Sequence, residues 1–70
     1  MDLVVLLGRN LRSHRRARGM SQEQLALEAG MKRSYVSELE RGLRNPTVRA
    51  LGRLAEALEI DPAVLFAVGD

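Results

Sequence analysis

Residues 21–42 read SQEQLALEAGMKRSYVSELERG, and this stretch decides the fold. Ser21 is a good helix N-cap, and Gln24, three residues later, completes a capping box. Gly30 follows the last apolar residue of this segment and can take the positive φ that ends a helix. A second helix then extends to Gly42. The pattern predicts two short helices around a tight turn, which is the arrangement of a helix-turn-helix.

The second of these helices has two different faces. Val36, Leu39 and Glu40 lie on one side at helical spacing. The other side carries mostly small polar and basic side chains, namely Arg33, Ser34, Ser37, Glu38 and Arg41. A helix-turn-helix presents a face of this kind to the major groove of DNA. Double-stranded DNA is therefore the predicted partner.

Charge is distributed unevenly along the chain, although the whole chain carries only +2. Residues 1–30 carry +2 and residues 31–49 carry +3, whereas residues 50–70 carry −3. A basic region around the second motif helix is what contact with DNA phosphates requires. Without the motif, the same charges would equally well describe a solvated face.

Composition limits the other functions. Seventy residues suffice for one domain with a small core, and we expect a single helix-turn-helix domain over residues 1–70. Cysteine is absent and His14 is the only histidine, so no disulfide or metal site is expected. The sequence shows no nucleophile–base pair, carboxylate dyad or phosphate loop, so we expect neither an enzyme nor a cofactor or small-molecule ligand. The apolar run Leu3–Leu7 is too short to cross a bilayer, and we expect a cytoplasmic protein without membrane contact.

Three further helices are predicted outside the motif. The first spans about residues 3–18, with apolar side chains on one face at Val4, Leu7 and Leu11. Thr47 caps a fourth helix, whose apolar stripe consists of Leu51, Leu54, Ala55 and Leu58. Asp61-Pro62 starts a fifth helix, which runs to about Val68. The predicted fold is all-α, a compact bundle of five short helices.

Several short motifs resemble the phage Cro and repressor type of helix-turn-helix, known as the XRE family. The carrying residues are Gly19, Ser21-Gln22-Glu23, Leu25-Ala26, Gly30, Ser37–Gly42, Asn45-Pro46-Thr47 and Leu54–Leu58. The resemblance covers roughly residues 7–66 and implies a lambda-repressor-like domain that regulates transcription. Within the family, Arg33–Ser37 and Arg44-Asn45 look most like the controller proteins of restriction–modification systems.

The second motif helix supplies the candidate base-reading residues. Arg33 lies early in it and can place its guanidinium on guanine O6 and N7. Ser34 and Ser37 can donate to or accept from a base edge or a phosphate. Glu38 has two interpretations: it accepts from cytosine N4, or it pairs with nearby Arg41 or Arg44.

Other residues are candidates for the DNA backbone. The resemblance gives Gln22 a phosphate contact, and gives Arg44, Asn45 and Thr47 a contact with backbone or minor-groove edge. Tyr35 can donate its hydroxyl to a phosphate while its ring packs. Free solvation is the alternative for Gln22 and Arg44.

Lys32 departs from the family pattern, which has Ser, Thr or Asp at this N-cap position. Lysine cannot accept a hydrogen bond there, so phosphate contact is its alternative role. The family also pairs Glu40 with an arginine of the first helix, here Arg15, and we expect a structural ion pair. The other arginines of that helix are expected to be partly structural and partly solvated, with phosphate contact as the alternative, and they are Arg9, Arg12, Arg16 and Arg18.

The end of the chain predicts a homodimer. Val64, Leu65, Phe66 and Val68 are large and apolar, and one helix face cannot bury all four because consecutive residues point about 100° apart. We expect the dimer interface among these four residues, with Phe66 and Val64 favoured there and Leu65 favoured for the protomer core. We also expect a pseudo-palindromic operator. The alternative is a tail folded onto its own domain.

A second function remains open from the sequence. Some proteins of this family act as antitoxins or coactivators, and the chain would then be a protein-interaction module of the same fold.

Overall fold

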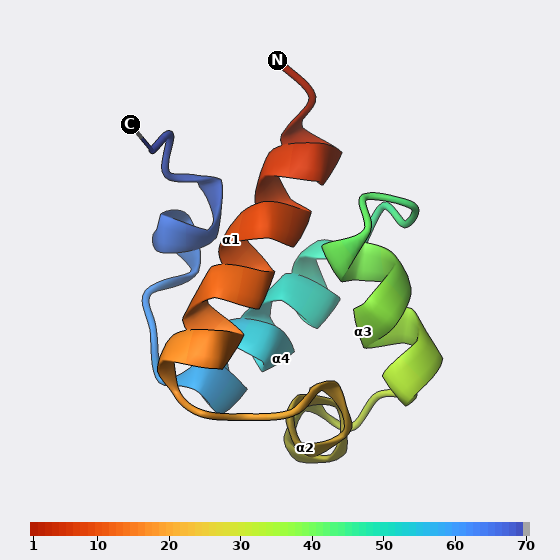
Figure 1. The fold of residues 1–70 in the computed structure, drawn as a ribbon. Helices are drawn as coiled ribbons and strands as arrows, with labels where there is room; N and C mark the ends of the chain where they lie inside the picture. The colour runs from red at the N-terminus through yellow and green to blue at the C-terminus, as the bar shows by residue number, and fades with distance from the viewer. Residues whose placement is uncertain (70) are drawn as a thin grey trace.

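The computed structural model describes residues 1–69 and contains four α-helices and one 3₁₀ helix (Figure 1). They are α1 (Leu3–Ala17), α2 (Gln22–Ala29), α3 (Arg33–Glu40), α4 (Val48–Leu58) and the 3₁₀ helix η1 (Pro62–Phe66). No strand occurs among these residues, so the predicted all-α class is confirmed. None of the helices described is both long enough and apolar enough to span a membrane.

The predicted fifth α-helix is wrong in type and in length. Asp61 caps the segment by accepting from the Ala63 N–H at 2.9 Å, as expected, but η1 ends at Phe66 and not at Val68. The Asn10 side chain of α1 donates to the carbonyls of Leu65 and Ala67, at 2.8 and 2.9 Å. These carbonyls are therefore satisfied without a longer helix, and Ala67 takes extended backbone angles.

The capping signals of the motif act as the sequence predicts. The Ser21 hydroxyl accepts from the Gln24 N–H at 3.0 Å, and the Gln24 side chain accepts from the Ser21 N–H at 2.8 Å. Gly30 ends α2 with φ at 69°, in the left-handed region. Lys32 occupies the N-cap of α3 without any side-chain hydrogen bond to the helix, so α3 starts less firmly than α2.

The core lies where all five elements meet. In Figure 1, α1 crosses the middle, α3 lies on one side of it and η1 on the other, with α4 behind. Leucines from α1, α2, α3, α4 and η1 are fully buried there, and they include Leu11, Leu25, Leu39, Leu54 and Leu65. The stripe predicted for α4 is buried except at Leu51, which is half-buried.

Gly8 lets α1 and α3 approach with their backbones in contact. A Cβ at this position would lie 2.3 Å from the Leu39 carbonyl oxygen, closer than any real side chain permits. The second motif helix, α3, therefore packs directly against the backbone of α1, and this contact fixes its orientation relative to the rest of the domain.

Candidate nucleic-acid interface

The polar face of α3 is open to solvent, and its apolar face is in the core. Lys32, Arg33 and Ser34 are exposed, and Tyr35, Ser37 and Glu38 are half-buried along the same helix. Val36 and Leu39 are fully buried, with no exposed surface. Because Arg33 and Ser34 lie in the first turn, their side chains stand at the end of α3 that follows the tight turn. This is the end from which a recognition helix contacts base edges.

A buried ion pair holds α3 to α1, as the family resemblance implied. Arg15 donates from Nε to Glu40 Oε2 at 2.6 Å and from Nη2 to Glu40 Oε1 at 3.0 Å. The side chains are only 10% and 2% exposed. A third donation, from Arg15 Nη1 to the Met20 carbonyl at 2.8 Å, ties the pair to the start of the motif. The paired geometry is bidentate, which is the strong form of an arginine–carboxylate contact.

The surroundings of Arg15 favour its charged form. Its pKa is raised above the ordinary arginine value, chiefly because its side chain donates to Glu40. Burial lowers that pKa, and the attraction of the Glu40 carboxylate raises it again. Because the pKa is raised, the stability that the Arg15 charge contributes is lost only as the pH rises through the arginine pKa, far above neutrality.

Gln22 belongs to the same network. Its Nε2 donates to Glu40 Oε1 at 3.1 Å, and the residue is half-buried. Neither interpretation drawn from the sequence, a phosphate contact or free solvation, included this bond. No local sequence pattern indicates this bond, since Gln22 and Glu40 are eighteen residues apart and meet only when α2 and α3 cross. The bond fixes the first residue of α2 against the last residue of α3.

Arg44 folds back onto α3 from the loop that follows it. Its Nε donates to Glu38 Oε1 at 2.9 Å, and its guanidinium carbon lies 5.0 Å from the centre of the Tyr35 ring. Of the two interpretations for Glu38, the structure shows pairing with Arg44 in the free protein. Both side chains stay substantially exposed, at 52% for Arg44 and 41% for Glu38, so a surface pair of this kind stabilises little.

The other two loop candidates, Asn45 and Thr47, differ in their contacts within the protein. Asn45 is exposed. Thr47 is the N-cap of α4, and its hydroxyl accepts from the Ala50 N–H at 3.0 Å. Thr47 therefore has a structural role that the sequence also predicted, and its hydroxyl retains a donor for a further contact.

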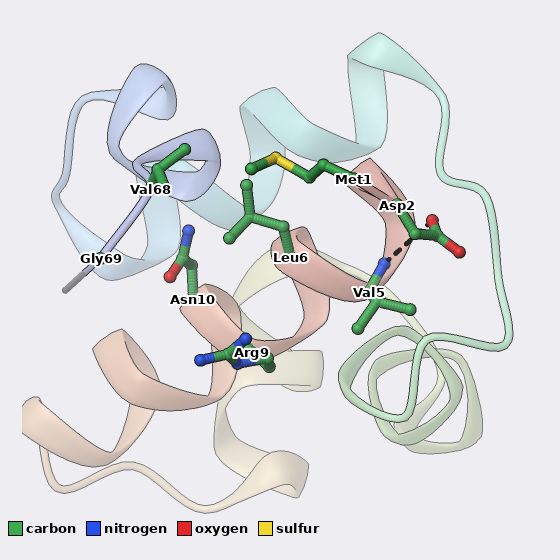
Figure 2. Close-up of a pocket in the computed structure, with 8 residues that line it drawn as sticks. All are labelled: Met1, Asp2, Val5, Leu6, Arg9, Asn10, Val68 and Gly69. Carbon is green, nitrogen blue, oxygen red and sulfur yellow. Dashed lines mark hydrogen bonds between the residues drawn. The ribbon is translucent and has the colours of Figure 1, made fainter.

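The four apolar residues expected at a dimer interface do not form one surface. Leu65 is fully buried in the protomer core, which removes it from any interface, and Val64 is half-buried. Val68 is exposed but lines a hollow of about 290 Å³ between the C-terminal segment and the start of α1, beside Met1 and Leu6 (Figure 2). Phe66 lines a different, almost wholly apolar groove formed with α4, whose other residues are Val48, Leu51, Gly52, Pro62 and Ala63. Leu65 thus lies in the protomer core, as the sequence favoured, and the interface role of Val64, Phe66 and Val68 stays a prediction.

The fold and the exposed face of α3 define a helix-turn-helix DNA-binding domain. The helix-turn-helix family model matches residues 11–65, and the chain belongs to this XRE-type family of transcription regulators. An uncharacterized HTH-type transcriptional regulator, y4dJ of Sinorhizobium fredii, is 41% identical over 70 residues, which are 100% of this chain and 91% of that protein.

Solved structures of restriction–modification controller proteins are also similar. C.AhdI from Aeromonas hydrophila matches with a TM-score of 0.88 and 48% identity, over 90% of this chain and 96% of that one. The tetramer of C.Esp1396I in complex with its natural 35-base-pair operator matches with a TM-score of 0.85 and 32% identity, over 94% and 87% of the two chains. The expected resemblance to controller proteins is therefore confirmed, and these relatives are transcription regulators and not enzymes.

Proposed function

We propose that the protein is a cytoplasmic, sequence-specific regulator of transcription that binds double-stranded DNA as a homodimer on a pseudo-palindromic operator. The observation that carries this proposal is the way in which α3 is held against the rest of the domain. Its inner side is held by Gly8 and by the Arg15–Glu40 pair, whereas Arg33 and Ser34 stand exposed at its start. A rigidly held helix with free polar side chains at its first turn has what major-groove recognition needs.

The proposed roles follow from exposure and donor chemistry. Arg33 is the principal base reader, and Ser34 and Ser37 contact base edges or nearby phosphates. Glu38 accepts from a cytosine amino group only when Arg44 leaves it. The proposed backbone contacts come from both ends of the motif and the following loop, and the residues are Gln22, Lys32, Tyr35, Arg44, Asn45 and Thr47.

A second copy of the chain is the proposed occupant of the groove between α4 and η1. Val48 is 84% exposed and Phe66 is 37% exposed at its two sides, in a protomer whose core is small. A two-fold contact there would present two α3 helices to successive major grooves about 34 Å apart. The solved tetramer of C.Esp1396I on its operator shows a related controller protein assembled on DNA, which supports the proposal.

Selection from random DNA tests the function. The wild-type protein should enrich one recurring sequence with two related half-sites. Arg33→Ala should weaken binding to that sequence by about 1–3 kcal/mol and relax the preference at one base step. Arg53→Ala, which removes an exposed arginine of α4, is the matched control and should leave the selected sequence unchanged. An unchanged sequence and affinity for Arg33→Ala would assign base reading to other residues.

Sedimentation tests the dimer. Phe66→Asp should dissociate the protein at micromolar concentration, because it places a charge in the apolar groove. Val68→Asp changes an exposed apolar residue at the other hollow and should leave the dimer intact. A wild-type protein that sediments as a monomer, free and on its operator, would refute this part of the proposal.

A further inference from the structure

The four arginines of α1 and Arg18, the C-cap of that helix, divide into two groups. Arg15 is buried against Glu40, and Arg18 donates to the Leu58 carbonyl at 3.2 Å and to the Glu59 carboxylate at 2.9 Å. The remaining three are exposed, and none of them has an ion pair or side-chain hydrogen bond within residues 1–69. We call these three the α1 arginine stripe, which consists of Arg9, Arg12 and Arg16.

The stripe forms one continuous basic surface. Its members are three, four and seven residues apart, which places them on one side of a helix. Together with Ser13 they line a shallow hollow, and no carboxylate lines it. Figure 2 shows Arg9 on the outer side of α1, apart from the Asp2 carboxylate, which instead accepts from the Val4 and Val5 N–H groups.

This arrangement brings the folded protomer no internal benefit. Like charges three or four residues apart destabilise a helix. Arg16 lies in the last turn and is favoured by the helix dipole, but Arg9 and Arg12 lie in the middle of α1. The unpaired charge therefore fits a partner outside the protomer, and the complement of three guanidinium groups without a carboxylate is a polyanion.

The position of the stripe relative to α3 points to the type of polyanion. Gly8 marks the line along which α1 contacts α3. At about 100° per residue, Arg12, Arg16 and Arg9 lie about 40°, 80° and 100° around the helix from that line. The stripe thus adjoins α3 on the solvent side. It extends for about 10 Å along the axis, a length over which one DNA strand presents about three phosphates.

We propose that the α1 arginine stripe is a second phosphate-binding surface, which contacts the backbone of duplex DNA next to the segment held by α3. The inference depends on the proposed function, because it requires a duplex at α3. It adds a contact that extends beyond the recognition helix and its loop, and it makes affinity depend on DNA that flanks the site read by the protein.

The test compares two duplexes that carry the same selected site, one trimmed to the site and one with long flanks of unrelated sequence. Wild-type protein should bind the long duplex more tightly. The variant Arg9→Gln/Arg12→Gln/Arg16→Gln should lose this advantage but keep its affinity for the trimmed site. Each phosphate contact contributes about 0.9 to the salt slope, so the slope on the long duplex should flatten by up to about 2.7 for each protomer that the DNA binds. The ratio of wild-type to variant affinity should then fall by about 40-fold per bound protomer between 50 and 200 mM salt.

Single variants and stability measurements control for general charge effects. Arg12→Gln should reduce the flank advantage, whereas Arg53→Gln, an exposed arginine of α4 without an ion pair in the described chain, should not. The triple variant should unfold near the wild-type temperature, because the repulsion it removes offsets the lost attraction between Arg16 and the helix dipole.

Three results would overturn the inference. The first is that wild type and the triple variant bind the long duplex with equal affinity at every salt concentration. The second is that the triple variant loses the same affinity on both duplexes. The third is that the triple variant changes self-association of the DNA-free protein while its DNA binding is unaltered. If wild type failed to prefer the selected site in the trimmed duplex, the proposed function itself would fail.

Discussion

Removing the Glu40 carboxylate should destabilise the protein far more than removing an exposed charge. In wild type, this carboxylate accepts two hydrogen bonds from Arg15 and one from Gln22, and its side chain is only 2% exposed. Glu40→Ala leaves the Arg15 guanidinium buried beside a small void. Loss of one partner of a buried pair typically costs about 3–5 kcal/mol. At about 0.05–0.15 kcal/mol per residue, that is a large part of the whole free energy of unfolding.

Thermal and urea unfolding measure this cost. A loss of about 3 kcal/mol should lower Tm by roughly 12–24 °C in a domain of this size. The protomer concentration must be the same for all variants, because dimerisation also stabilises the folded state. Glu38→Ala is the matched control: it removes a carboxylate from the same helix, but from an exposed pair worth about 0–1 kcal/mol.

Two results separate the interpretations of Glu40. The double variant Arg15→Met/Glu40→Leu should recover much of the lost stability, since it removes the unpaired charge together with its partner. A Glu40→Ala protein with the unfolding free energy of Glu38→Ala and a new base preference would refute the structural role. It would make Glu40 a DNA-reading residue instead.

Three further changes should act through local packing and capping. Gly8→Ala should destabilise by about 1–3 kcal/mol in urea unfolding, because its methyl group meets the Leu39 carbonyl. An unchanged free energy of unfolding would contradict the close approach of α1 and α3. Asn10→Ala should lower the free energy of unfolding by about 1–3 kcal/mol, because it removes two hydrogen bonds to the C-terminal segment. It should also speed amide exchange in residues 67–69, and unchanged exchange would show that other contacts hold this segment. Lys32→Ser should raise stability by about 1 kcal/mol through a new N-cap for α3, and an unchanged Tm would argue against an uncapped helix start.

The sequence predicts the motif well because its signals are local. The capping box at Ser21 and Gln24 and the positive φ of Gly30 each depend on residues within a few positions. The apolar face of α3 follows from helical spacing alone. The Arg15–Glu40 pair joins residues twenty-five positions apart, and it was expected only through resemblance to a family.

The remaining features depend on tertiary contacts. Gly8 looks like any helical glycine until α3 is placed against it. The 3₁₀ form of η1 reflects a side chain fifty-five residues away, because Asn10 satisfies the Leu65 carbonyl that a longer helix would have used. Four apolar residues within a five-residue span indicated an interface, but only the packed structure shows that Phe66 and Val68 line different hollows.

The ratio of affinities for two duplexes tests the central claim most directly. The duplexes have equal length, one carrying the selected site and the other a scrambled sequence of the same composition, at physiological salt. A sequence-specific regulator should bind its site at least about a thousandfold more tightly, and Arg33→Ala should reduce that ratio by roughly 5- to 150-fold. A ratio near one for the wild-type protein would contradict the account, because α3 would then contact DNA, if at all, through charge alone.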